Sequence, residues 1–302
     1  MKKLMISLLL LCACTIGANA QLLYKISGKS LKAPSYIIGT HHLAKTSFVD
    51  SIPGVKDALA SCAQVYGELP WDDMMNPDSM KYMQSAMMLP QGQKLSNVLS
   101  VEQYQKLNAY LKSLLQTDLT NPMLEAQMGQ FTPTTINTQL SLISYLMKHQ
   151  GDFDPNNTID QYFQKEAKKE GKPVGGLETV AFQTQVLLAG ETMERQVELL
   201  MCFLDNTKFS EDMTEEMSKA FYAQDLKGIK EVMDVKLNTS CDETPEEEAA
   251  SIDNRNADWL KKMPTIMAEN STFFAVGAAH LPGEKGVLEG LQRLGYKVEG
   301  VK

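Results

Sequence analysis

The sequence predicts an α/β fold with a central mixed sheet and a large helical insertion in its middle. Short apolar segments typical of strands occur at residues 22–26, 35–38, 64–67, 173–177, 272–276 and 296–301. Residues 76–204 instead carry apolar side chains mainly at helical spacing. Because no linker-like or low-complexity run divides the chain, we expect one domain over residues 21–302 with the insertion inside it.

The first half of the chain predicts a hairpin, a helix and a strand in that order. A turn at residues 27–30 separates the first two strands, which is the arrangement of a hairpin. A helix is expected over residues 53–62, directly before the strand at 64–67. Within the helical middle, residues 158–171 predict an amphipathic helix that ends at Gly171, followed by the strand at 173–177.

The last part of the chain predicts a long helix and two closing strands. Thr244 can cap the helix, Pro245 occupies its first turn, and Glu247 completes a capping box. The strands at 272–276 and 296–301 then enclose a shorter helix over residues 284–294.

Residues 1–20 predict a signal peptide. Lys2 and Lys3 precede an apolar run over residues 4–16, and Ala18-Asn19-Ala20 offers the small residues that a signal peptidase reads. Export to the periplasm is therefore expected. Lipoprotein processing is the alternative, because residues 11–14 loosely fit a lipobox and acylation of Cys14 would tether the protein to a membrane.

The charge and cysteine content narrow the classes of partner. Removing Lys2 and Lys3 reduces the 29 basic residues to 27 against 37 acidic ones, a net charge near −10. Nucleic acids and anionic membrane surfaces demand clustered Lys and Arg, so this charge argues against both. Cys62, Cys202 and Cys241 remain, and they allow one disulfide whose pairing the sequence leaves open.

An internal repeat gives the first candidate site residues. Residues 36–43 align with residues 274–281, and each segment reads aromatic, apolar, apolar, Gly, two residues, His, Leu. Two of the four histidines, His42 and His280, thus take equivalent places. The pattern predicts a buried strand that ends at glycine, with the histidine just beyond its carboxyl end, where open α/β sheets form their ligand crevice.

Two other strands lead into carboxylates. The strand at 64–67 is followed by Glu68, and the strand at 173–177 by Glu178. If these two strands and the two strands of the repeat are parallel neighbours, then His42, His280, Glu68 and Glu178 line one edge of the sheet. Two imidazoles and a carboxylate are typical of an open catalytic site for a divalent metal, so we expect His42, His280 and Glu68 as ligands. Glu178 would act as a general base or orient a ligand.

The long helix near the end of the chain adds two polar candidates. Asn256 falls on an apolar face that also carries Trp259 and Met263, and Arg255 lies at the edge of that face. Polar groups on a buried face must find partners. Arg255 therefore either stabilises an oxyanion or forms a structural salt bridge with Glu68 or Glu178.

These residues resemble the TraB/PrgY/GumN family, whose animal relatives are the Tiki proteases. The similarity runs through Gly39-Thr40-x-His42, the Glu68 strand, Asp160 and its helix, Gly176-Leu177-Glu178-Thr179 with Gln183, Arg255-Asn256, and Gly277-x-x-His280. The resemblance implies a fold like the erythromycin-esterase and ChaN-like proteins, with two related α/β halves. It also implies metal-dependent hydrolysis of peptide bonds, with Mn or Co ahead of Zn or Fe. His42, Glu68 and His280 would form the centre, and Arg255 would contact the substrate or transition state.

We therefore expect an exported, divalent-metal-dependent hydrolase that acts on a peptide or protein. Arg255 or Asn256 would stabilise the tetrahedral oxyanion. The alternative is a periplasmic protein that binds a peptide or haem without turnover. Kinship to ChaN-like haem binders favours this alternative, as do Met80, Met83 and Met87, whose helical spacing would suit an adaptable groove wall.

Overall fold

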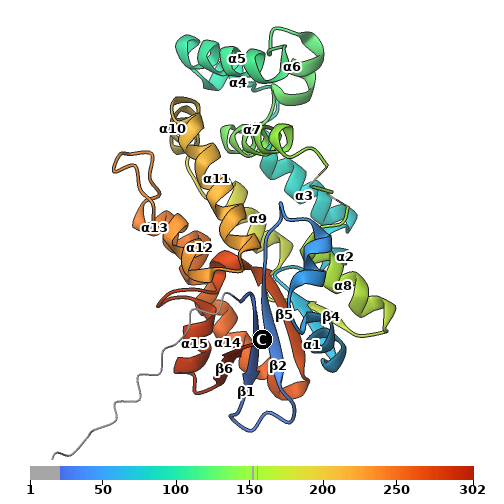
Figure 1. Cartoon of the computed structure of the whole chain (residues 1–302). Coiled ribbons are helices and arrows are strands. Elements are labelled where there is room, and N and C mark those ends of the chain that lie inside the picture. The colour runs from blue at the N-terminus through green and yellow to red at the C-terminus, as the bar shows by residue number, and fades with distance from the viewer. Residues whose placement is uncertain (1–20, 152, 155) are drawn as a thin grey trace, which may run out of the picture.

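A six-stranded mixed sheet forms the lower half of the protein (Figure 1). The structure is a computed structural model that describes residues 21–151, 153–154 and 156–302. Its strands are β1 (Leu23–Ser27), β2 (Ser35–Thr40), β3 (Gln64–Gly67), β4 (Val174–Gly176), β5 (Thr272–Gly277) and β6 (Lys297–Gly300). All six predicted strands are thus confirmed. The predicted signal peptide, with Cys14, lies outside the described residues.

The strand order places the four predicted site strands side by side. The order across the sheet is β4-β3-β5-β2-β1-β6. β1 pairs antiparallel with β2, which confirms the opening hairpin, and β6 pairs antiparallel with β1. β4, β3, β5 and β2 run parallel to one another, as the site hypothesis requires. Their carboxyl ends therefore meet at one edge of the sheet.

Helices surround the sheet and extend beyond one end of it (Figure 1). In chain order they are η1 (Thr46–Ser51), α1 (Val55–Ser61), α2 (Trp71–Met74), α3 (Pro77–Met87), α4 (Leu95–Val98), α5 (Val101–Leu115), α6 (Pro122–Met128), α7 (Pro133–Lys148), α8 (Ile159–Lys169), α9 (Val180–Leu188), α10 (Met193–Asp205), α11 (Thr207–Tyr222), α12 (Leu226–Met233), α13 (Pro245–Glu248), α14 (Asn254–Glu269), η3 (Ala278–His280) and α15 (Val287–Arg293). None of the helices in the described part of the chain has the length and apolarity needed to cross a membrane.

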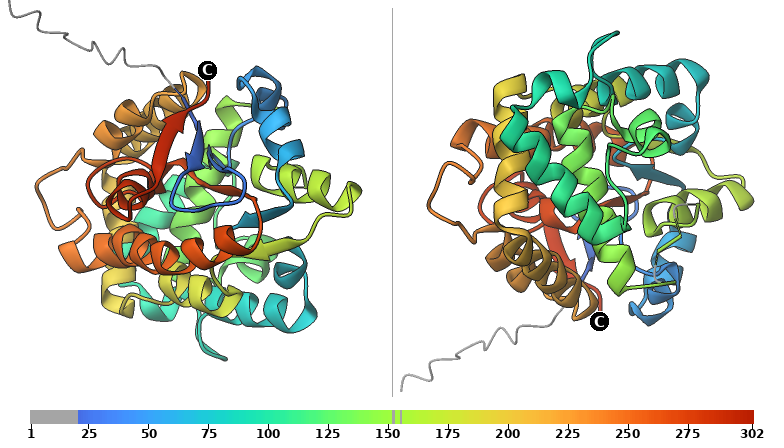
Figure 2. Two further views of the ribbon diagram at one scale, coloured as in Figure 1. Left: turned by 90° about the horizontal axis from the view of Figure 1, so that it is seen from below. Right: turned by 90° about the horizontal axis from the view of Figure 1, so that it is seen from above.

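The main hydrophobic core lies against the sheet. Figure 2 shows helices along both faces of the sheet. From α8, the fully buried Phe163 places its ring 4.9 Å from the ring of Phe273 on β5. From α14, Trp259 and Met263 are also fully buried, as the apolar face of that helix predicted. These helices fix the positions at which the site residues leave the sheet.

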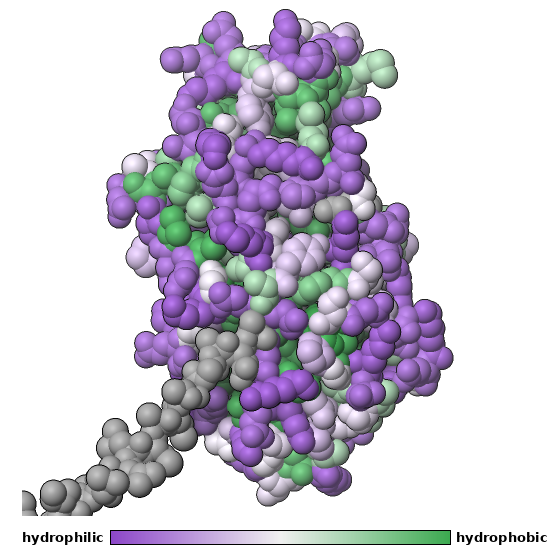
Figure 3. Space-filling model, in the orientation of Figure 1, coloured by the Kyte–Doolittle hydropathy of each residue, from purple (hydrophilic) through white to green (hydrophobic). Residues whose placement is uncertain are grey.

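The predicted insertion over residues 76–204 divides into two parts. Its α3–α7 and α10 helices stand above the sheet, where buried residues such as Leu107, Ile136 and Leu200 form a second hydrophobic cluster. α8 and β4, in contrast, return to the sheet, and β4 pairs with β3. Hydrophilic residues dominate the face shown in Figure 3.

The long helix expected from Thr244 is interrupted. Thr244 and Glu247 form the predicted capping box at the start of α13. A π-helical turn over Ala249–Asp253 then separates α13 from α14. Such turns insert one extra residue per turn and often occur at functional sites. Here the turn directly precedes Arg255 and Asn256, two predicted site residues.

Candidate functional site

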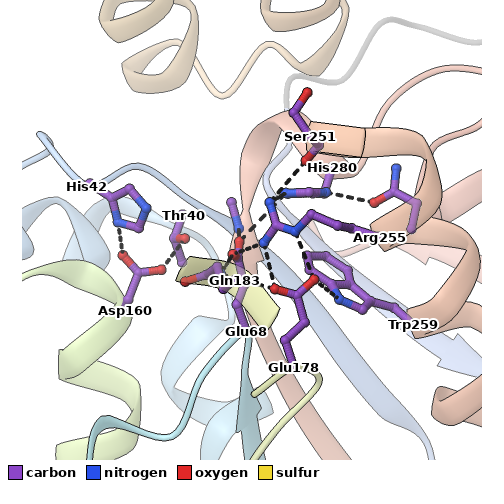
Figure 4. Close-up of polar contacts among 12 residues, drawn as sticks. Thr40, His42, Glu68, Asp160, Glu178, Gln183, Ser251, Arg255, Trp259 and His280 are labelled. Carbon is purple, nitrogen blue, oxygen red and sulfur yellow. Dashed lines mark hydrogen bonds and ion pairs between the residues drawn. The ribbon is translucent and has the colours of Figure 1, made fainter. Parts of the chain in front are cut away.

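The carboxyl ends of the parallel strands bring the predicted residues to one edge of the sheet (Figure 4). Glu68 directly follows β3, and Glu178 comes two residues after β4. His280 ends the short helix η3 that follows β5, and His42 comes two residues after β2. Strands far apart in the sequence thus supply the candidate residues, as the repeat and the two strand-end carboxylates predicted.

Arg255 connects the two carboxylates. Its Nη2 donates to Glu68 Oε2 over 2.6 Å, and its Nε donates to Glu178 Oε1 over 2.8 Å. The Arg255 side chain is 4% exposed and that of Glu178 only 1%. Burial alone would lower the pKa of Arg255, but the hydrogen bond that Arg255 donates to Glu178 and the charge of Glu68 outweigh burial and raise the pKa. The salt bridge considered for Arg255 is therefore present, and it reaches both carboxylates.

Two further side chains complete this network, and the residue patterns alone gave them no role. Gln183 Nε2 donates to Glu68 Oε2 over 2.9 Å and to Glu178 Oε2 over 3.2 Å. Trp259 Nε1 donates to Glu178 Oε1 over 2.8 Å. Trp259 lies four residues after Arg255, so both reach the same side of α14. Glu178 is thus enclosed by donors, which favours an orienting role over that of a general base.

Glu68 is held close to the second Gly-x-x-His segment. The Gly277 N–H donates to Glu68 Oε1 over 2.8 Å, and the same oxygen lies 3.9 Å from His280 Nε2. A Cβ atom at Gly277 would lie only 3.1 Å from this oxygen, so glycine permits the close approach. Burial opposes ionisation of Glu68, but His280 and Arg255 outweigh it and lower the pKa of Glu68. Glu68 is therefore a carboxylate at neutral pH.

His280 is buried, with both ring nitrogens engaged. Nδ1 lies 2.7 Å from Asn256 Oδ1, and Nε2 lies 3.1 Å from Arg255 Nη1. A guanidinium can only donate, so Nε2 is the acceptor and Nδ1 carries the proton that Asn256 accepts. Burial, aided by the charge of Arg255, lowers the pKa of His280 to about 4. Asn256 therefore fixes the tautomer of a neutral imidazole. Its Nδ2, the group that could donate to an oxyanion, instead donates to the Lys285 carbonyl oxygen over 3.0 Å.

His42 lies in a different setting. Its side chain is 72% exposed, and its Nδ1 lies 2.9 Å from Asp160 Oδ2. The Thr40 hydroxyl donates to the other oxygen of Asp160 over 2.5 Å. The charge of Asp160 and the hydrogen bond to it raise the pKa of His42 to about 9, so Nδ1–H donates to Asp160 at neutral pH. The residue patterns gave Asp160 no role, although it sits in the first turn of α8 within the family resemblance.

A cavity of about 550 Å³ opens over this edge of the sheet. Glu68, Arg255 and His280 line one part of it, and His42 and Asp160 line another. The Glu68, Arg255 and His280 group and the His42–Asp160 pair therefore face the same cavity. Its volume lies within the size range of small-ligand sites.

The donor set fits a divalent cation by chemical type. Glu68 is ionised, His280 is neutral with its tautomer fixed by Asn256, and His42 faces the same cavity. A carboxylate with two imidazoles is a common ligand set, and a hydrogen bond from the second nitrogen of a ligating histidine is its usual support. In the described residues, however, no three His, Cys, Asp or Glu side chains gather closely enough to hold a metal ion. The predicted ligand set therefore stays a prediction.

Comparison with known proteins identifies similar chains. The family model described as the TraB/PrgY/gumN family matches residues 22–300. Metalloprotease TIKI1 of Xenopus tropicalis is 27% identical over 305 aligned residues, which cover 88% of this chain and 59% of that protein. Metalloprotease TIKI1 of Homo sapiens is 26% identical, with 88% and 59% covered, and Metalloprotease TIKI2 of Danio rerio is 24% identical, with 88% and 58% covered.

These relatives are longer than the present chain. The matched region spans less than two thirds of their length. The match therefore covers only part of each relative. No solved structure matches the chain significantly.

Proposed function

The chain belongs to the TraB/PrgY/gumN family, and from that premise we propose that it is an exported, divalent-metal-dependent hydrolase of peptide bonds. The relatives supply the class, since they are named as metalloproteases. One observation carries the proposal to this chain: an ionised Glu68 and a neutral His280 lie 3.9 Å apart in a cavity that His42 also lines. Ionised carboxylate and neutral imidazole are the protonation states that metal ligands require.

Each residue of the network has a role in this proposal. Glu68, His280 and His42 would hold the cation, and a bound cation would lower the pKa of a water molecule to give a nucleophile near neutral pH. Arg255 lines the cavity and keeps a positive charge there, which suits an oxyanion that develops on the substrate carbonyl. Asn256 and Glu178 are positioning residues, for His280 and Arg255 respectively.

Cation binding requires two local changes. His280 Nε2 must exchange the Arg255 N–H for the cation, because both use the same lone pair. His42 must lose the proton that its raised pKa retains at neutral pH, if its Nδ1 or Nε2 is to ligate. Binding should therefore release a proton and weaken as the pH falls.

Export is part of the proposal and is supported by the cysteines. Cys202 on α10 forms a disulfide with Cys241, while Cys62 stays a buried free thiol. Structural disulfides persist in oxidising compartments such as the periplasm. The N-terminal sequence supports the same compartment, either as a soluble protein or, if Cys14 is acylated, as a membrane-tethered one.

The first test is the metal content of the purified mature protein. We expect near-stoichiometric Mn, Co, Zn or Fe in the wild type, with Mn or Co favoured, and loss of that metal in His42→Ala and His280→Ala. His149→Ala is the matched control, because His149 hydrogen-bonds Glu215 of α11 and does not line the cavity. A wild type that stays metal-free after dialysis against each cation would refute the metal-dependent mechanism.

The second test is hydrolysis of a peptide library by the metal-loaded protein. We expect cleavage by the wild type and by His149→Ala, and none by His280→Ala. Retained activity in His280→Ala would refute the assigned site even if the protein binds metal elsewhere.

Haem binding without turnover is the second candidate, and one observation favours it. Met74 and Met217 line the same cavity as His42, and both thioether and imidazole can ligate haem iron. This candidate predicts a Soret band on haem addition that is lost in His42→Ala. No spectral change at saturating haem would dispose of it.

A further inference from the structure

The cavity beside the candidate site has an apolar wall that the proposed hydrolysis does not use. Six hydrophobic side chains contribute to this wall, and they come from four helices: Trp71 and Met74 of α2, Leu187 of α9, Met217 and Phe221 of α11, and Ile229 of α12. We call this set the apolar wall. We infer that it receives a large apolar side chain of the peptide substrate, at a residue that flanks the scissile bond. The inference rests on the proposed function and deepens it.

Part of the apolar wall is rigid. Phe221 and Ile229 are buried and belong to the main core of the sheet. The Phe221 ring also lies 5.3 Å from the ring of His41 and 5.5 Å from that of Phe48. A side chain fixed by packing on several sides presents a preformed surface, and a preformed surface costs little ordering entropy when a ligand binds.

The rest of the wall is adaptable and open to the substrate. Met74 and Met217 are half-buried, and Leu187 is 44% exposed. Methionine is unbranched and polarizable, so it adjusts to ligands of different shape. The exposed part of these side chains is apolar surface that a substrate would remove from water, which favours binding.

The charges of the cavity are already paired. Glu68 accepts from Arg255, and Asp160 accepts from Thr40 and His42. A charged substrate side chain placed against the apolar wall would lose its hydration without forming an ion pair with either of these carboxylates. The same cavity therefore binds a Leu, Met or Phe side chain well and rejects Asp or Lys.

The size of the cavity agrees with this occupant. Its volume of about 550 Å³ exceeds what one side chain fills, so a large side chain fits together with the adjoining peptide backbone. The backbone would then pass Glu68, Arg255 and His280, which line the same space.

Binding of an uncleavable peptide tests the inference independently of catalysis. The probes are two peptides with a reduced amide at the central bond that differ only in one flanking residue, Leu or Ala. We expect the Leu peptide to bind the wild type at least about tenfold more tightly, the lower end of what a single methylene gives in a hydrophobic pocket. Calorimetry measures both dissociation constants. Equal affinities for the two peptides, or failure of both to bind, would overturn the inference.

Variants of the wall locate the effect. Met217→Ala and Leu187→Asp should each reduce the preference for Leu over Ala, and Leu187→Asp should reduce it further because it adds a charge. Met123→Ala is the matched control, since Met123 is 75% exposed on α6, outside the cavity. A wall variant that keeps the wild-type preference, with unchanged thermal unfolding, would also overturn the inference.

Hydrolysis separates this inference from the proposed function. Metal-loaded protein should cleave the natural-amide Leu peptide with at least about tenfold higher kcat/KM than the Ala peptide. Equal cleavage of both would overturn the inference and leave the hydrolase intact. Selective binding without any cleavage would support the wall and refute the hydrolase.

Discussion

The two Gly-x-x-His segments have the same local pattern and opposite electrostatic states. His280 is 5% exposed in its side chain, accepts from Arg255, and has its pKa lowered to about 4. His42 is 72% exposed, donates to Asp160, and has its pKa raised to about 9. One histidine is thus neutral and the other charged at pH 7. The comparison shows that the repeat positions an imidazole, while its neighbours decide the protonation state.

The backbone explains how the two copies diverge. β2 and β5 are parallel neighbours, but Thr40 and not Gly39 pairs with Gly277, so the copies are offset by one residue. After Gly277 the chain forms the helix η3, which carries His280 to a buried position beside α14. A Cβ atom at Gly39 would lie 2.9 Å from Cβ of Ala278, so the first glycine makes room for the second segment. His42 is left at the open side of the cavity.

Among these predictions, the largest loss of stability should follow from removing Arg255, the buried counter-charge beside the second Gly-x-x-His segment. We expect Arg255→Met to reduce the free energy of unfolding by about 3–5 kcal/mol, because it leaves Glu68 and Glu178 buried without a counter-charge. Asp160→Asn should cost less, because the histidine that pairs with Asp160 is 72% exposed and remains solvated when its partner is neutralised. Urea denaturation measures both. Arg293→Met is the control, since the Arg293–Glu289 pair is exposed. Equal losses in Arg255→Met and Arg293→Met would contradict the contrast.

Removing the partner of the His280 Nδ1 should weaken the proposed metal site. In Asn256→Ala the ring loses the acceptor that fixes its tautomer, and we expect affinity for Mn²⁺ to fall by about 10–100-fold. Calorimetric titration of Mn²⁺ into the metal-free protein measures the change. Asn108→Ala is the control, because Asn108 accepts from Leu119 in the helical region. Wild-type affinity in Asn256→Ala would show that the tautomer does not matter.

The two histidines should give stability profiles of opposite sign. The pKa of His280 is about 4 in the folded protein and near 6.5 unfolded, so the unfolded state binds more protons between these values and stability falls as the pH drops from 6.5 to 4. The pKa of His42 is raised to about 9, so its contribution is full below 6.5 and is lost as the pH rises through 9.

Urea denaturation across pH, with two variants, separates these contributions. His280→Gln should flatten the change between pH 4 and 6.5, and His42→Gln should flatten the change between pH 6.5 and 9. Unchanged profiles in both variants would mean that other groups control the stability in these ranges.

The last prediction concerns the neutralisation of Asp160. In Asp160→Asn the pKa of His42 should fall from about 9 toward 6.5, because the charge that raises it is removed. Titration of the His42 imidazole resonances by NMR, in the wild type and in Asp160→Asn, measures the change. A pKa of His42 that stays near 9 would assign its charge to a partner other than Asp160.

The sequence by itself determined where the strands lie in the chain and which residues most of the candidate site contains. The sequence predicted the strand ends at Glu68, at Glu178 and at the two Gly-x-x-His segments. These ends were predictable because a strand and the residues that follow it are neighbours in the chain. The apolar face of α14 likewise placed Asn256 among buried residues, because helical periodicity is local. The pattern of strands and helices predicted the α/β fold, and the family resemblance then connected these short segments.

Only the tertiary structure decided which groups meet and what charge they carry. Asp160 contacts His42 across 118 positions of sequence, and Gln183 contacts Glu68 across 115. No local pattern encodes such contacts, since they depend on how α8 and α9 pack against the sheet. Protonation depends on burial and on neighbouring charges, which are properties of the folded chain. For this reason, identical Gly-x-x-His segments yield one neutral and one charged histidine.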